Sequence, residues 1–162
     1  MNTSHHNKFL SVTISFDLDD TLIPSSKTFL TERQNFLHFL FGIEKLRLGT
    51  IDLFTWLKKE NYNICIYTTS YRSRLKIRTT FLLNGFWIKK IINQQRHNNE
   101  VDAAFKICSK HPPSFGIDVH IDDSEGLSLE GQRFNFRTII VSEKDENWSR
   151  KIIEILSNLD VV

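Results

Sequence analysis

Two acidic pairs are the residues of this chain whose types and spacing best suit chemistry. Asp17 and Asp19 stand two residues apart, and Asp122 and Asp123 are adjacent in a later part of the chain. Carboxylates gathered at one site repel each other, and a hard divalent cation together with a lysine offsets that charge. Asp-rich runs also occur in calcium loops and helix caps, so the elements that carry the pairs must decide between these uses.

Both pairs follow hydrophobic runs that predict β-strands. Apolar and polar side chains alternate over residues 12–16, which are rich in β-branched residues. Residues 117–121 form a similar run that leads into Asp122. In an open α/β sheet, ligands bind at the carboxyl ends of the strands. The two pairs are therefore expected at the ligand-binding edge of one sheet.

Hydroxyl groups follow another predicted strand. Residues 64–67 are short, apolar and typical of a buried parallel strand, and Thr68, Thr69 and Ser70 come directly after them. A helix is predicted from there to about Asn84. Hydroxyl and amide groups at a helix N-terminus bind phosphate oxygens, so this segment is a candidate phosphate site.

Strands and helices alternate along the rest of the chain. Further strands are predicted at 88–92 and 137–141, and helices at 31–41, 51–60, 98–108 and 148–159. The alternation predicts an α/β fold, a Rossmann-like three-layer sandwich with a mainly parallel five-stranded sheet and helices on both faces. We expect a single domain over residues 1–162, with residues 1–10 as a flexible tail.

Composition narrows the classes of function. The 162 residues are 40% hydrophobic and 25% charged, and the net charge of +2 is too small to imply nucleic-acid or membrane binding. No apolar run is long enough to span a membrane, and the first residues lack an apolar signal core. We expect a cytoplasmic protein in which Cys65 and Cys108 are buried, reduced thiols. His5 and His6 are expected to be tail residues, not metal ligands.

The run Asp17-Leu18-Asp19-Asp20-Thr21-Leu22 resembles the first motif of the haloacid-dehalogenase-like (HAD) phosphohydrolases, DxDxT or DxDxV. The later order of elements is similar too: a hydrophobic strand with Thr or Ser, then Lys, then a hydrophobic strand with an acidic pair. The resemblance extends over residues 12–142. It implies a Mg²⁺-dependent phosphatase that hydrolyses a phosphate monoester through an aspartyl-phosphate intermediate.

The resemblance also implies roles in the chemical steps. Asp17 matches the nucleophile, and Asp19 matches the residue that protonates the leaving oxygen and then activates water. Thr68 matches the phosphate-binding residue, with Thr69 contributing mainly an amide. Thr21 matches the residue whose hydroxyl supports the loop.

A Mg²⁺ site is implied as well. The expected metal residues are Asp17, Asp19 through its main-chain carbonyl, and the acidic pair. Asp123 is the better ligand of that pair, whereas Asp122 is expected to orient the lysine or a metal-bound water. The ion would orient the transferring phosphoryl group and stabilise its transition-state charge.

Two lysines precede the fourth predicted strand, and one of them matches the lysine of the motif order. Val101, Phe105 and Cys108 define the apolar face of the helix predicted there, and Lys106 points away from that face. Lys110 lies past the end of that helix, from where it can reach back over the sheet edge. We therefore expect Lys110 to be the catalytic and phosphate-binding lysine, and Lys106 to be a surface charge.

Other polar residues near the predicted strand ends have weaker claims. Arg72 and Arg74 could meet a second anionic group of a substrate, but solvated surface charges are the simpler expectation. Arg96 and His97 could line the mouth of the site, although His97 is more simply a surface or cap residue. Trp148 and the other tryptophans are expected in the core.

The segment between Asp17 and Thr68 bears on substrate access. Larger members of the HAD family insert a cap domain there or after the third strand, whereas here the segment is predicted to be a loop and two helices. We therefore expect a capless or minimally capped protein, open on one side. A large substrate or a neighbouring subunit would then complete the site.

A Phe-rich helix in that segment is the candidate interface. Phe36, Phe39 and Phe41 lie on more than one side of it. Burial against the sheet is the simpler expectation, and exposure as an interface is the alternative. The expected partners are a phosphorylated small molecule or macromolecule and a second copy of the chain.

Three alternative functions compete with a phosphatase. A phosphotransferase or mutase shares the covalent intermediate and stays open. A receiver-type signalling domain would have its acceptor Asp at the end of the third strand, but that strand ends near Asn93 and Gln94. A non-catalytic binding module is not favoured, because every catalytic position of the motif order is occupied.

Overall fold

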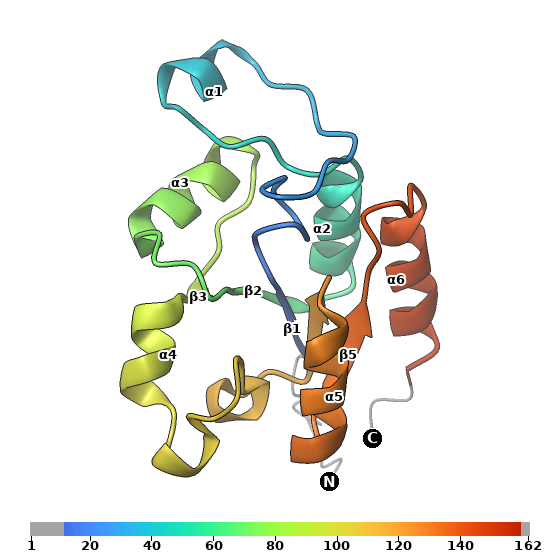
Figure 1. Ribbon diagram of the computed structural model, residues 1–162. Coiled ribbons are helices and arrows are strands. Elements are labelled where there is room, and N and C mark those ends of the chain that lie inside the picture. The colour runs from blue at the N-terminus through green and yellow to red at the C-terminus, as the bar shows by residue number, and fades with distance from the viewer. Residues whose placement is uncertain (1–11, 160–162) are drawn as a thin grey trace, which may run out of the picture.

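The computed structural model describes residues 12–159, and its centre is a five-stranded sheet (Figure 1). The strands are β1 (Thr13–Phe16), β2 (Asn63–Tyr67), β3 (Lys90–Ile92), β4 (Val119–Asp122) and β5 (Arg137–Ile140). They pair in the order β3-β2-β1-β4-β5, and every pairing is parallel. The predicted α/β fold with a parallel sheet is confirmed.

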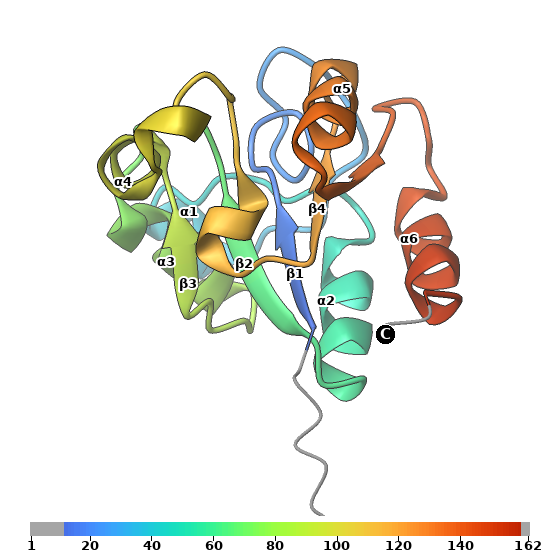
Figure 2. The ribbon, with the colours of Figure 1, turned by 90° about the horizontal axis from the view of Figure 1, so that it is seen from below.

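Helices lie on both sides of the sheet (Figure 2). They are α1 (Phe36–Leu40), α2 (Thr50–Lys59), α3 (Arg74–Leu83), α4 (Gln94–Glu100), α5 (Glu125–Phe134) and α6 (Trp148–Ser157), with 3₁₀ turns η1 (Ala103–Phe105) and η2 (Pro112–Phe115). Helices α2, α3 and α6 cover one face, and α4, α5 and the two turns lie over the other (Figure 2). The layers result from the βα alternation and its crossovers.

The core is divided by the alternation of side chains along each strand. Ile14 and Phe16 of β1 belong to the larger cluster, with buried residues of α2, α3 and α6. Cys65 and Tyr67 of β2 belong to a smaller cluster on the opposite face, together with Phe115 of η2. That second face also carries the buried polar residues that reach the candidate site.

The strand order places a switch point beside β1. The chain runs from β1 outward to β2 and β3, and it then returns to add β4 on the other side of β1. In doubly wound sheets, ligands bind at the carboxyl ends of the strands that flank such a point. Asp17 directly follows β1 and Asp122 ends β4, so the topology brings the two acidic pairs together.

The prediction of a helix at 98–108 is wrong. The helix in this region is α4, which begins at Gln94 because the side chain of Asn93 caps it by accepting a hydrogen bond from the Arg96 amide at 3.1 Å. The helix ends at Val101, which is extended, and η1 follows. A second difference is α5, a helix that the sequence pattern did not predict.

Residues 24–48 form a segment that extends from the sheet, here called the projecting segment (Figure 1). Its base is closed by an antiparallel bridge between Thr31 and Arg47. The buried Arg47 side chain donates to the Ser142 carbonyl at 2.7 Å and stacks 4.7 Å from the Trp148 ring. These contacts fasten the base of the segment to the start of α6.

Helix α1 in the projecting segment is shorter than predicted and not buried against the sheet. The helix begins only after Asn35, whose side chain caps it by accepting a hydrogen bond from the His38 amide. Residues 31–34 are outside the helix, and Thr31 pairs with Arg47 in the bridge instead. Phe36 is 77% exposed and Phe39 is 71% exposed. Of the two expectations for this helix, exposure is therefore the one observed.

Some of the remaining expectations for single residues are confirmed, and one is wrong. Cys65 and Cys108 are buried free cysteines, as expected. Trp148 is in the core, but Trp87 is 57% exposed, so the placement of every tryptophan in the core is wrong. No helix within residues 12–159 has the length and hydropathy needed to cross a membrane. The tail at residues 1–10, with His5 and His6, lies outside the described residues.

Candidate active site

Lys110 joins the two acidic pairs. Its ammonium nitrogen lies 2.5 Å from Oδ1 of Asp17 and 2.5 Å from Oδ2 of Asp122, and all three side chains are buried. The Asp17 amide donates to the Ile121 carbonyl at 2.8 Å, which extends the pairing of β1 with β4 beyond the strand. Two carboxylates from neighbouring strand ends therefore share one buried cation.

Two effects set the pKa values of this cluster: burial, which disfavours the charged form of each group, and the charges of the neighbouring groups. Burial raises the pKa of Asp17 and the Asp122 charge adds to that, while the Lys110 ammonium opposes both. Burial acts against ionisation of Asp122 too, but hydrogen bonds and the charge of Lys110 hold its pKa below the usual range. The two carboxylates outweigh burial at Lys110 and raise its pKa, so the lysine is an ammonium ion.

The structure places Lys110, and not Lys106, at the acidic pairs. Lys106 follows η1 and is exposed. Lys110 precedes η2, and the Ser109 amide before it donates to the Glu130 carboxylate at 3.1 Å, which fixes the loop to α5. The preference for Lys110 therefore agrees with its position, although the helix used to argue it ends at Glu100, before either lysine.

Asp19 faces an arginine that was expected to be solvated. Arg72 Nη1 lies 2.7 Å from Asp19 Oδ2, and Arg72 Nη2 lies 2.8 Å from Glu44 Oε1. The expectation of a solvated Arg72 is wrong, because these two carboxylates hold it between the site and the projecting segment. The buried Oδ1 of Asp19 has no hydrogen-bond partner among the described residues.

Asp123 is held by a cation from the projecting segment. Lys27 Nζ lies 2.6 Å from Asp123 Oδ2, and Thr21 Oγ1 donates to Asp123 Oδ1 at 3.1 Å. The hydrogen bond and charge of Asp123 raise the pKa of Lys27. Thr21, expected to support the loop, thus ties the end of the Asp17 loop to the second acidic pair.

The oxygen donors suit a hard divalent cation. Asp17 and Asp123 have carboxylates to offer, the resemblance implies the Asp19 main-chain carbonyl as a third donor, and the Lys27 ammonium already lies against Asp123. Within residues 12–159 no three His, Cys, Asp or Glu side chains form a metal-binding group, but this donor set needs only two. The chemistry of these donors therefore fits Mg²⁺, and the metal site stays a prediction.

Asp122 contacts the lysine instead of remaining open for a metal. Its Oδ2 accepts from Lys110, and from His120 Nε2 at 3.1 Å, and its Oδ1 accepts from the Ser124 amide at 2.9 Å. Of the two roles expected for Asp122, orientation of the lysine is the one that these contacts favour.

Thr68 is buried at the end of β2, and its hydroxyl accepts from the Ser70 amide at 3.1 Å. The hydroxyl proton can therefore be directed at a phosphate oxygen. Thr69 is exposed. The expected helix N-terminus is not at these residues, because α3 begins at Arg74 with Ser73 as its cap. Arg74 itself is exposed, as expected for a surface charge.

Sequence reasoning missed a buried histidine network behind the site. His97, expected at the surface or a cap, is buried, and its Nδ1 lies 2.5 Å from the Tyr67 hydroxyl. His120 in β4 contacts Asp122 directly. The one sequence signal was a polar residue at a buried strand position, two residues before the acidic pair and thus on the same side of the strand.

Comparisons with known proteins identify the fold. No protein-family model matches the chain and no curated protein does, whereas solved structures match. A structure described as a predicted HAD-like family hydrolase from Porphyromonas gingivalis is 14% identical, with a TM-score of 0.51, over 92% of this chain and 99% of that one. A HAD-superfamily hydrolase of subfamily IA, variant 1, from Geobacter sulfurreducens is 13% identical, with a TM-score of 0.55, over 90% and 96%.

The chain shares the fold of these two structures. On this fold, Lys110 hydrogen-bonds to Asp17 and to Asp122, and Asp123 directly follows Asp122 in the chain. Thr68 follows β2, the strand beside β1.

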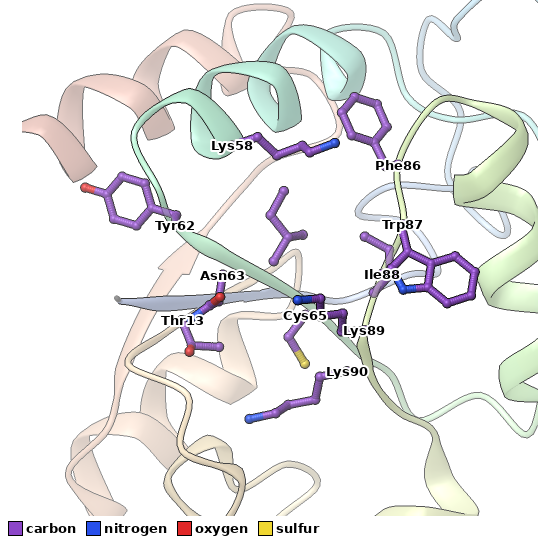
Figure 3. A pocket seen from close by; sticks show the side chains of 11 residues that line it. Thr13, Lys58, Tyr62, Asn63, Cys65, Phe86, Trp87, Ile88, Lys89 and Lys90 are labelled. Carbon is purple, nitrogen blue, oxygen red and sulfur yellow. The ribbon is translucent and has the colours of Figure 1, made fainter. Parts of the chain in front are cut away.

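A separate hollow lies at the opposite end of the strands. It has a volume of about 440 Å³, and Figure 3 shows Lys58, Phe86, Trp87 and Lys90 among its lining side chains. Thr13, the first residue of β1, also lines it. The hollow therefore lies at the amino ends of β1, β2 and β3, away from Asp17 at the carboxyl end of β1, and it has no part in the candidate site.

Proposed function

We propose that this protein is a Mg²⁺-dependent phosphatase that hydrolyses a phosphate monoester through an aspartyl-phosphate on Asp17. The observation that carries the proposal is the buried Lys110 ammonium between Asp17 and Asp122 at the switch point of a HAD fold. A nucleophile on phosphorus works among anionic oxygens, so a fixed cation beside it favours approach of the substrate.

Each residue has a task in this scheme. Asp17 attacks phosphorus and the leaving oxygen departs with a proton from Asp19, which then takes a proton from the water that attacks the aspartyl-phosphate. Lys110 and the Thr68 hydroxyl bind the phosphoryl oxygens. Oδ1 of Asp19, which lacks a partner among the described residues, is the atom available for the proton transfers.

Asp17, Asp123 and the Asp19 carbonyl would hold the metal ion. When bound, Mg²⁺ supplies positive charge that orients the phosphoryl group and offsets the charge of the transition state. Lys27 must leave Asp123 to free that carboxylate, so the base of the projecting segment and the metal site are coupled in this scheme.

A substrate screen tests the proposal. Phosphorylated metabolites, nucleotides and phosphopeptides would be incubated with the protein and MgCl₂, and phosphate release would be measured. We expect release from at least one class, loss of release in EDTA, and recovery with added Mg²⁺. Activity that survives thorough chelation would exclude the metal-dependent scheme.

The covalent intermediate also separates hydrolysis from transfer. Phosphoenzyme trapped by acid quench and located by mass spectrometry should carry phosphate on Asp17. Breakdown in water alone supports a phosphatase. If breakdown instead requires a sugar acceptor, the protein is a phosphotransferase or mutase with the same intermediate.

A further inference from the structure

A chain of buried polar groups runs through the sheet behind Lys110. Ser15 in β1 and His120 in β4 are register partners across the two strands, and both side chains are fully buried. Ser15 Oγ lies 2.6 Å from His120 Nδ1, and His120 Nε2 lies 3.1 Å from Asp122 Oδ2. Because Asp122 also contacts Lys110, the hydrogen bonds run from Ser15 through His120 and Asp122 to Lys110, the cation of the site.

The partners determine which ring nitrogen of His120 carries the proton. Oδ2 of Asp122 already accepts from the Lys110 ammonium, so it is an acceptor for His120 too, and Nε2 is the donor. Nδ1 of a neutral ring then accepts, and the Ser15 hydroxyl is its donor. The hydroxyl therefore selects the tautomer that donates to Asp122.

The position of His120 excludes direct contact with substrate. Its side chain is fully buried, with the ring 5.6 Å from that of Tyr67, and Asp122 and Lys110 lie between it and Asp17. Oδ1 of Asp122 is already fixed by the Ser124 amide, so the contact with His120 fixes the second oxygen, which is the one that binds Lys110. Without it, Oδ2 is held only by Lys110 itself, so the carboxylate and the lysine can shift together about the Ser124 contact.

We propose that His120 is a positioning residue for Lys110, acting through Asp122, with Ser15 selecting its tautomer. The effect on turnover rests on the proposed function, but the arrangement itself does not. A displacement of the lysine of about 1 Å is enough to slow a positioned reaction on the order of 100-fold.

The test compares three replacements at position 120. His120→Gln retains an amide donor near the place of Nε2, His120→Asn has an amide nearer the place of Nδ1, and His120→Met fills the volume without a donor. We expect Gln to keep kcat within about 3-fold for p-nitrophenyl phosphate with MgCl₂, and Asn and Met to lower it about 10- to 100-fold with little change in KM. Val119→Ala, a buried change in the same strand, is the matched control for lost stability and should leave kcat unchanged.

Nuclear magnetic resonance provides a readout that needs no activity. In wild-type protein, ¹⁵N shifts should report His120 as the neutral Nε2–H tautomer, and the Lys110 ammonium should give a signal protected from exchange. The signal should persist in His120→Gln and Val119→Ala and broaden in His120→Met and in Ser15→Ala.

Two results would overturn the proposal. One is an Nδ1–H or charged ring in the wild-type protein. The other is a His120→Met variant with unchanged kcat and an unchanged Lys110 signal. If the protein hydrolyses no phosphate ester but these NMR results hold, the proposed function fails while the positioning of Lys110 by His120 stands.

Discussion

Lys110 is the residue on which the candidate site depends. It is buried, and its one positive charge lies between the Asp17 and Asp122 carboxylates. Burying an ionised group costs much of what its ion pair gains, so such a cluster is a weak source of stability. Retention of these charges at a strand edge is better explained by chemistry.

Replacement of Lys110 by methionine tests how much this ion pair cluster contributes to the free energy of unfolding. Lys110→Met leaves two buried carboxylates without their cation, and we expect a loss of about 3–5 kcal/mol in the free energy of unfolding. Urea denaturation measures the loss. The double variant Lys110→Met/Asp122→Asn should recover part of it, and a double variant no more stable than the single one would contradict the charge argument.

Replacement of Asp17 separates chemistry from folding. Asp17→Asn keeps the shape of the side chain but removes the attacking oxyanion, so we expect at least about a thousandfold loss of turnover with a cooperative unfolding transition retained. Phosphate release and circular dichroism provide the two measurements. A folded variant with near wild-type activity would show that Asp17 is not the nucleophile.

Helix α2 shows how an element depends on a glycine at its start. Gly49 is the N-cap, with a φ of +90°, and a Cβ built there would lie 2.7 Å from Ser149 Oγ and 3.2 Å from Ser149 Cβ. The tight approach lets α2 meet the start of α6, where Trp148 Nε1 donates to the Leu48 carbonyl at 2.8 Å. Left-handed backbone and close packing therefore coincide at one residue.

Gly49→Ala should destabilise the protein by about 2–3 kcal/mol, through backbone strain plus the clash with Ser149. Gly42→Ala is the matched control, because Gly42 also has a positive φ, of 58°, but a Cβ there meets nothing within 4 Å. We expect that control to cost about 1 kcal/mol. Equal losses in thermal unfolding of the two variants would remove the packing term from the explanation.

At the scale of the whole molecule, buried histidines link stability to pH. Burial lowers the pKa of His97 and His111, and that of His120 to about 4, from an ordinary 6.5. Below pH 6.5 the unfolded chain binds protons that the folded histidines reject. Their contribution to stability is therefore complete above pH 6.5 and is lost as the pH falls toward 4.

We expect the protein to be less stable at pH 5 than at pH 7.5, and His97→Gln to have a shallower dependence. Asp17 acts in the opposite direction because its pKa is raised, so the difference between wild type and variant is the quantity to measure. Denaturant unfolding at the two pH values provides it. Parallel pH dependences for the two proteins would show that His97 does not contribute.

Self-association stays a prediction at this scale. The projecting segment carries exposed Phe36, Phe39, Leu40 and Phe41 at one end of the molecule (Figure 1). We expect light scattering to give a mass above that of one chain, and Phe36→Ser with Phe39→Ser to reduce it. A strict monomer that prefers a small phosphorylated metabolite would remove both the subunit and the large-substrate explanation of how the site is completed.

The amino-acid sequence by itself determined the strands, their parallel sheet and the edge at which the acidic pairs meet. These features depend on local patterns, because hydrophobic runs form buried strands and the residues after parallel strands share one edge. Asp17, Thr68 and Asp122 could be placed there for this reason. Lys110 was expected at the same edge and lies there, although the argument for it used a helix that the structure places elsewhere.

Only the tertiary structure decided the partners of these groups. Asp17 meets Lys110 from 93 positions away, Arg72 meets Asp19 from 53, and Ser15 meets His120 from 105. No local period encodes such pairs, because they depend on how loops return over the sheet edge and on which strand faces carry polar groups. The exposure of α1 was undecidable for the same reason, since an apolar helix is buried only if the fold offers it a surface.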